Sequence, residues 1–100
     1  MEALEYYRDY PGYELVSKGI RDLENGTVSQ ESILVEIASH NLSAAGLLEQ
    51  PTRRREPELA LYHYLSERIS DAHYQYKALT DRLVKFEQAL LLNQAQSHQV

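Results

Sequence analysis

Cysteine is absent from this chain of 100 residues. The fold therefore contains no disulfide, no thiolate zinc site and no cysteine nucleophile, and cysteine usage gives no indication of the redox compartment. No stretch approaches the roughly 20 apolar residues that a membrane-spanning helix needs. The opening Met-Glu-Ala-Leu-Glu is acidic and lacks the apolar segment of a secretory signal, so we expect a cytoplasmic protein that makes no membrane contact.

Motifs for catalysis and for cofactor binding are also missing. The sequence contains no glycine-rich phosphate loop, no His-Glu-x-x-His zinc motif and no serine, histidine and aspartate order with a supporting context. No cofactor is therefore expected, although catalysis by groups that only the fold brings together stays open. The formal net charge of -5 argues against a broad nucleic-acid surface, because phosphate binding needs a concentrated basic patch.

The residues that are present fit one all-α domain. Apolar residues make up 43% of the chain and charged residues 25%, which is the balance of an ordinary soluble globular protein. A chain of this length can bury one core of modest size. Valine and isoleucine are few and never alternate with polar residues, so no strand is predicted.

The strongest pattern is a heptad stripe in the second half, with no proline or glycine between Glu58 and Val100. Its apolar residues follow one another at alternating steps of three and four, the spacing of a helix that packs along its length against another helix. They are Tyr62, Leu65, Ile69, Ala72, Tyr76, Leu79, Leu83, Phe86 and Leu90. The stripe predicts one long amphipathic helix.

The first half predicts a short antiparallel helical hairpin. Asn25 and Gly26 tolerate the left-handed conformation that closes a helix, and Thr27 or Ser29 would cap the next one. Gly19 permits the two helices to cross closely. The predicted segments are an N-terminal arm (1–11), the helical hairpin (12–42), a linker (43–57), the long heptad helix (58–93) and a frayed tail (94–100).

These lengths predict a dimer. At 1.5 Å per residue the long helix would extend about 50 Å and each hairpin helix about 20 Å, so the hairpin covers about half of the stripe. The half from Leu79 to Leu90 would stay exposed in a single chain, and an apolar strip of that size usually marks an interface. We therefore expect a homodimer, or pairing with a helix of another protein. The interface residues would be Leu65, Ile69, Ala72, Tyr76, Leu79, Leu83, Phe86 and Leu90.

Aromatic usage is uneven, with eight tyrosines against one phenylalanine and no tryptophan. Tyrosine fills apolar space while keeping a hydroxyl that needs a partner or water, so it suits both cores and interfaces. The tyrosines form two clusters, which suggests that the N-terminal arm lies against the first half of the long helix. The clusters are Tyr6, Tyr7, Tyr10 and Tyr13, then Tyr62, Tyr64, Tyr74 and Tyr76.

The segment Arg68-Ile-Ser-Asp-Ala-His73 resembles the R-x4-H motif of HEPN ribonucleases. In that family of small all-helical proteins, the arginine and histidine of two protomers meet in a dimer cleft and act on RNA. The resemblance covers six residues and departs from the family at Ile69, where asparagine or aspartate is usual, and at Gln75, where tyrosine is common. Because positions five apart on an uninterrupted helix point about 140° apart, Arg68 and His73 would meet only across a dimer.

Three adjacent arginines, Arg53, Arg54 and Arg55, form the only basic concentration and lie in the predicted linker. They could contact a phosphate, RNA or an acidic partner. Alternatively, one arginine offsets the surrounding Glu49, Glu56 and Glu58 and the others are solvated. The preceding residues 37–48 loosely resemble the core of a helix-turn-helix motif, one residue short. Asn41-Leu42-Ser43 is interpreted as a break after the second helix.

Two pairs spaced four apart, Glu36 with His40 and His63 with Glu67, each place two potential metal ligands on one helix face. A site of two histidines and two carboxylates would form if the two helices faced each other there. The simpler interpretation is a histidine at a helix C-terminus and a second one on the surface, and no metal is expected.

We therefore predict a non-enzymatic helical protein-interaction or adaptor module that self-associates through its heptad helix. Two alternatives remain. A HEPN-like ribonuclease requires Arg68 and His73 to line one shared polar cleft. A small nucleic-acid-binding regulator requires salt-dependent binding that is lost when Arg53, Arg54 and Arg55 are neutralised.

Overall fold

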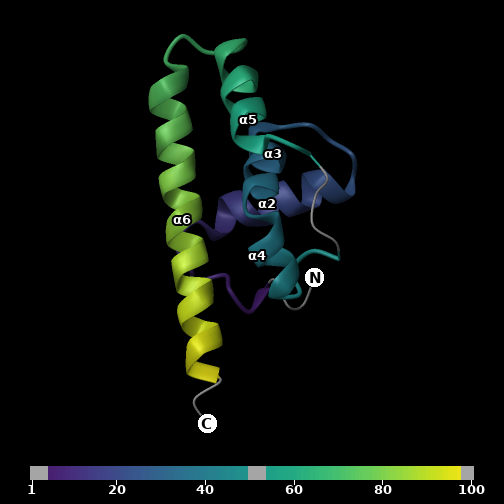
Figure 1. The fold of residues 1–100 in the computed structure, drawn as a ribbon, viewed down its shortest axis with the longest axis vertical. Coiled ribbons are helices and arrows are strands. Elements are labelled where there is room, and N and C mark those ends of the chain that lie inside the picture. The colour runs from purple at the N-terminus through teal and green to yellow at the C-terminus, as the bar shows by residue number, and fades with distance from the viewer. Residues whose placement is uncertain (1–4, 50–53, 98–100) are drawn as a thin grey trace.

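The structure, a computed structural model, describes residues 5–49 and 54–97, with side chains as far as Asn93. These residues form helices and no strand, which confirms the predicted all-α class. In Figure 1, α6 runs along the length of the molecule and the other helices pack on one side of it. No helix in the described part of the chain is long and apolar enough to cross a bilayer. The helices are α2 (Tyr13–Glu24), α3 (Gln30–Ile37), α4 (Ser39–Ala44), α5 (Pro57–Ser66) and α6 (Ala72–Ser97).

Helices α2 and α3 pack tightly but do not lie antiparallel along their lengths as predicted, because α2 crosses α3 (Figure 1). The crossing occurs at Gly19, as the sequence indicated. A Cβ atom at this position would lie 2.3 Å from the backbone oxygen of Glu31 and 2.7 Å from Val35 Cγ1. Glycine is therefore required for the backbones to approach this closely.

Ser29 is the residue that begins α3. Its Oγ accepts a hydrogen bond from the backbone N–H of Ser32 at 3.1 Å, and Ser32 Oγ accepts one from the Ser29 N–H at 2.9 Å. The cap is tied to α2 as well, because Ser29 Oγ donates to Asp22 Oδ2 at 2.7 Å. Lys18 Nζ donates to the same carboxylate oxygen at 2.7 Å. These contacts, the Lys18 bond first and the Ser29 bond second, lower the pKa of Asp22 below its usual value.

The chain continues as α4 after a single turn residue, so the predicted break at Asn41-Leu42-Ser43 is wrong. The backbone N–H of Leu42 donates to the carbonyl of Ala38 at 2.9 Å, and the Leu42 side chain is fully buried. Burial of this leucine holds the segment helical despite the weak helix formers on either side of it. The next helix begins at Pro57, a residue suited to the first helical position.

The predicted single helix over residues 58–93 is also wrong. Helix α5 ends at Ser66, α6 begins at Ala72, and the two lie side by side in opposite directions (Figure 1). On α5 the stripe residue Leu65 is buried but Tyr62 is 39% exposed, whereas α6 presents most of its part of the stripe to the inside of the molecule. Helix α6 also extends to Ser97, beyond the predicted end at Asn93, and residues 98–100 lie outside the described part of the chain.

Side chains rather than a proline or glycine form the turn between α5 and α6. Arg68 Nη1 donates to the carbonyl oxygen of Tyr64 at 3.0 Å, which satisfies a carbonyl that the end of α5 leaves without a helical partner. The Asp71 carbonyl accepts the N–H of Gln75 at 3.1 Å, so Asp71 stands at the N-terminal cap of α6, a position that aspartate favours.

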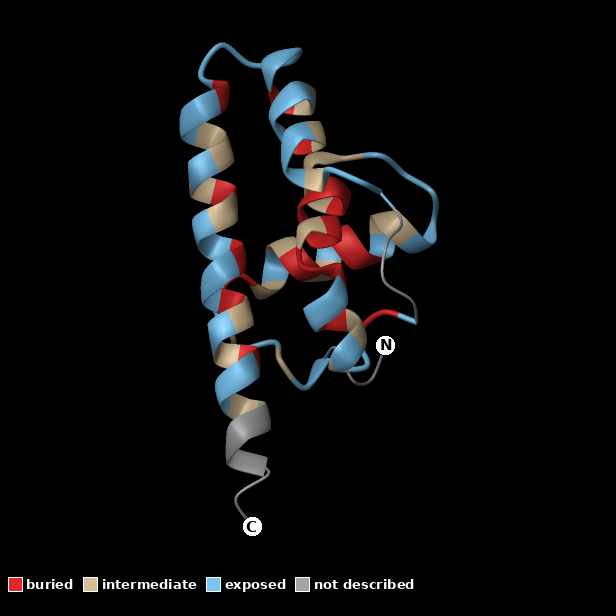
Figure 2. Ribbon diagram, viewed as in Figure 1, coloured by how far each residue is buried: buried red, intermediate tan, exposed pale blue. Residues whose placement is uncertain are grey.

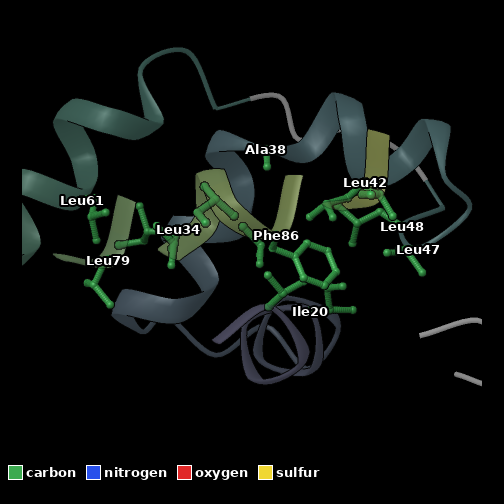
Figure 3. Close-up of a cluster of buried hydrophobic side chains, with 14 of the residues drawn as sticks. Ile20, Leu34, Ala38, Leu42, Leu47, Leu48, Leu61, Leu79 and Phe86 are labelled. Atoms are coloured by element: carbon green, nitrogen blue, oxygen red, sulfur yellow. The ribbon is translucent and has the colours of Figure 1, made fainter. Parts of the chain in front are cut away.

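The hydrophobic core lies between α6 and the helices beside it (Figure 2). Leu61 and Leu79 stand at one end of the cluster, Leu34 and Phe86 in its middle, and Leu47 at the other end (Figure 3). The largest fully buried side chains are Phe86, Ile20, Leu34, Leu42, Leu61, Leu83 and Leu90. All of α2 to α6 thus contribute to a single core.

The N-terminal arm packs against the second half of the stripe and not against the first half as predicted. The rings of Tyr7 and Tyr10 lie 6.3 and 6.0 Å from the ring of Phe86. Gly12, with φ of 80°, then passes so close to α6 that a Cβ atom would lie 2.7 Å from the backbone oxygen of Arg82. The arm and the start of α2 therefore cover the part of α6, from Leu79 to Leu90, that was predicted to be exposed in a single chain.

Candidate functional site

The heptad stripe is the core of a single chain. Leu79, Leu83, Phe86 and Leu90, which were predicted to be exposed without a partner, are buried under the arm and the crossing helices. Leu65 and Ala72 are buried, Tyr76 is half-buried, and Ile69 in the turn is 40% exposed. The premise for a dimer interface on these residues is therefore wrong, because a helical hairpin satisfies the same spacing within one chain.

Arg68 and His73, the residues of the ribonuclease-like motif, are not brought into one cleft of this chain. The Arg68 guanidinium lies 3.7 Å from the centre of the Tyr64 ring, where it also donates to the Tyr64 carbonyl. His73 stands on the first turn of α6 and lines a depression together with Tyr62 and Tyr76, and Arg68 is not part of the lining of that depression. Arg68 thus acts as a cap of α5, which the local signal of a basic residue just after a helix end could have indicated.

The arginine cluster is divided among different environments. Arg54 Nε donates to Glu36 Oε2 at 2.7 Å, and Glu36 is buried on α3. Arg54 is thus neutralised within the chain, but by Glu36, which is 18 residues away, and not by the surrounding glutamates that the sequence suggested. Arg55 is exposed, and Arg53 lies outside the described residues. Arg54 attaches the linker to α3 and is not available as a free phosphate contact.

The remaining sequence candidates do not form sites. Among the residues that the structure describes, no three histidine, aspartate or glutamate side chains come together as metal ligands. The segment that resembled a helix-turn-helix core contains the short helix α4 followed by turns and bends over 45–49, so no second helix is present there to enter a DNA groove.

Helix α6 carries a second stripe, which we name the outer stripe, on the side opposite the core. Its residues are exposed and recur at the same alternating steps of three and four: Tyr74, Lys77, Asp81, Val84, Gln88 and Leu91. Tyr74 is 71% exposed, Val84 46% and Leu91 51%. Sequence reasoning missed this face because half of its positions are polar, which hides the period from a search for apolar residues.

The outer stripe is hollowed near its N-terminal end. Tyr74, Lys77, Ala78 and Asp81 line a shallow depression of about 230 Å³, open to solvent. Lys77 Nζ lies 3.8 Å from Asp81 Oδ2 on the rim. Lys85, one turn further along, is exposed and has no ion pair among the described residues. The hollow and the exposed Leu91 thus lie at opposite ends of the same helix face.

A second depression, which we name the hairpin groove, lies between α5 and α6. It has a volume of about 380 Å³ and is lined by Glu58, Leu59, Tyr62, His73 and Tyr76. The Tyr62 and Tyr76 rings lie 5.7 Å apart with an interplanar angle of 64°. Glu58, at the edge of the groove, has no ion pair among the residues that the structure describes.

Comparisons of the chain with protein-family models, with curated proteins and with solved structures find no match.

Proposed function

We propose that the chain is a non-enzymatic helical protein-interaction module that pairs with a second copy of itself through the outer stripe of α6. The observation that carries the proposal is this exposed face, which has the spacing of a helix seam and faces away from the core. Residues at alternating steps of three and four lie on one side of a helix, and such a row of residues can pack along a second helix. The predicted self-association thus moves from the buried stripe to its opposite face.

The charges along the outer stripe favour an antiparallel pair. In a parallel pair each position meets its own copy, so Lys77 would face Lys77 and Asp81 would face Asp81, which is destabilising. In an antiparallel pair with Val84 opposite Asp81, the same register places Gln88 opposite Lys77. Asp81 of each helix then stands at the level of Lys85 of the other. Two-fold symmetry forms this ion pair twice.

The shape of the outer stripe is self-complementary in the same register. Leu91 of one helix lies opposite Tyr74 of the other, at the edge of the hollow that includes the small residue Ala78. Leu91 is 51% exposed in the single chain, so insertion into the hollow removes apolar surface from water. Because half of the positions in the stripe are polar, we expect a reversible dimer rather than an obligate one.

A charge exchange tests the proposal directly. Asp81→Lys alone places a lysine beside Lys85 of the other copy, and Lys85→Glu alone places a glutamate beside Asp81, so each single variant brings like charges together. The double variant restores both ion pairs with reversed sign. Exposed ion pairs contribute about 0.2–1 kcal/mol each, so each single change should weaken a dimer that contains two of them by roughly 2- to 30-fold. Light scattering after gel filtration across a dilution series measures the dissociation constant.

The matched control is Arg55→Glu, which changes the net charge as Lys85→Glu does but is an exposed residue of the linker before α5 and not of α6. It should leave the dissociation constant unchanged. Circular dichroism should show native helix content in all variants, since the altered side chains are exposed. A monomer at every concentration, or a double variant as weak as the single ones, would show that the outer stripe does not pair in this way.

The two alternative functions have less support from the geometry. The ribonuclease reading needs Arg68 beside His73, but Arg68 stacks on Tyr64. The nucleic-acid reading needs the arginine cluster, but Arg54 pairs with Glu36. Neither observation favours a second proposal.

A further inference from the structure

We infer that the hairpin groove is a binding site for an arginine side chain of a partner protein. The groove is separate from the outer stripe and lies on the side of α6 that faces α5. Each helix contributes two residues at a spacing of three, namely Leu59 and Tyr62 from α5 and His73 and Tyr76 from α6. This inference does not rest on pairing through the outer stripe.

The walls of the groove suit a flat cation. The Tyr62 and Tyr76 rings meet at an angle of 64°, so one ring can present a face to a group that lies against the edge of the other. A guanidinium stacks on such a face while the methylene stem of arginine packs against Leu59. The same chemistry occurs elsewhere in this chain, where the Arg68 guanidinium lies 3.7 Å from the centre of the Tyr64 ring.

The charge of the groove also selects a cation. Glu58 is exposed at its edge and has no ion pair among the described residues, and a carboxylate accepts two parallel hydrogen bonds from a guanidinium. The lining contains neither lysine nor arginine, so Glu58 meets no fixed positive charge within the groove. Arginine fits better than lysine because only a planar group can stack on a ring and bond a carboxylate along its edge.

Two-dimensional NMR of the isotopically labelled full chain is the appropriate test, with acetyl-Leu-Arg-Leu-amide as the probe. Shifted signals should be confined to the groove residues. The citrulline peptide, which has nearly the same shape but no charge, and the lysine peptide should both bind more weakly. Glu58→Gln removes the carboxylate and should raise the dissociation constant by roughly 1.5- to 5-fold, the effect of losing one exposed ion pair.

The matched control is Glu67→Gln, an exposed carboxylate at the far end of α5, which should leave binding unchanged. Tyr62→Leu keeps an apolar side chain without a ring and should weaken binding of the arginine probe. Each variant is accepted only if its spectrum shows the native fold. Equal binding of the citrulline or lysine peptide, or unchanged affinity in Glu58→Gln, would overturn the inference. So would groove signals that shift with protein concentration alone, because a second copy would then occupy the groove.

Discussion

Replacing Gly19 with alanine should destabilise the protein, although alanine is the better helix former. The substitution removes the entropic cost of glycine and so gains about 0.8–1 kcal/mol in an isolated helix. In the folded chain the new Cβ atom would lie 2.3 Å from the backbone oxygen of Glu31 and 2.7 Å from Val35 Cγ1. Both contacts are far inside van der Waals distance, so the packing of α2 on α3 must change.

The magnitude follows from the balance of these two effects. Overpacking a core costs about 1–3 kcal/mol, and the upper end applies at Gly19 because the closest atom belongs to a helix backbone and cannot rotate away. After subtracting the gain in helix propensity, we expect a net loss of about 2 kcal/mol in the free energy of unfolding. For a domain of this size the thermal midpoint should fall by roughly 8–16 °C.

Thermal unfolding followed by circular dichroism at the helix band measures this change. Ser17→Ala is the control, because it lies on the same helix and should gain about 0.5 kcal/mol from helix propensity while adding no atom, since serine already has a Cβ. An unchanged or higher midpoint for Gly19→Ala would mean that α2 and α3 can separate without cost. The close crossing would then not be a determinant of the fold.

Three further substitutions probe the polar contacts that position α3. Asp22 has a lowered pKa, so its contribution to stability is complete above the unfolded pKa near 3.8 and is lost as the pH falls through the folded value. The urea midpoint of the native chain should therefore decrease at pH values below about 4, and that of Asp22→Asn should decrease less. Ser29→Ala should lower the free energy of unfolding by about 1 kcal/mol, because the N-terminal cap of α3 is lost. Arg54→Met removes the ionic partner of buried Glu36 and should cost about 1–2 kcal/mol in urea unfolding, less than a fully buried pair because Arg54 is partly exposed. An unchanged midpoint for Arg54→Met would show that the ion pair does not hold the linker.

Features that depend on neighbouring residues could be predicted from the sequence. The crossing at Gly19, the cap at Ser29 and the helix start at Pro57 each follow from the conformational preference of one residue and its immediate context. The all-α class follows in the same way from the period of the apolar residues.

The turn between α5 and α6 could not be predicted in this way. A heptad stripe has the same spacing whether it faces another chain or folds back on its own, and no proline or glycine marks the turn. The decisive contacts are made by Arg68 and by burial of Phe86 under Tyr7 and Tyr10, nearly 80 residues away in the sequence. Contacts of that kind exist only after the chain has folded.

The candidate sites also could not be predicted without the folded arrangement of the helices. The outer stripe became visible only when the buried face of α6 was known, because Lys77, Asp81 and Gln88 interrupt its apolar pattern. The hairpin groove exists only because α5 and α6 lie side by side. Both of its tyrosines belong to the stripe in the sequence, but their spacing does not predict that the rings of Tyr62 and Tyr76 contact each other.

Cysteine crosslinking tests antiparallel pairing through α6 most directly, because the chain has no cysteine of its own. At 1.5 Å per residue, the two Val84 positions of the proposed dimer lie about 4.5 Å apart along the axis and the two Leu91 positions about 25 Å apart. Val84→Cys should therefore form a disulfide-linked dimer under mild oxidation, whereas Leu91→Cys should form one only when mixed with Tyr74→Cys. Rapid crosslinking of Leu91→Cys with itself, or none by Val84→Cys, would contradict the proposed pairing.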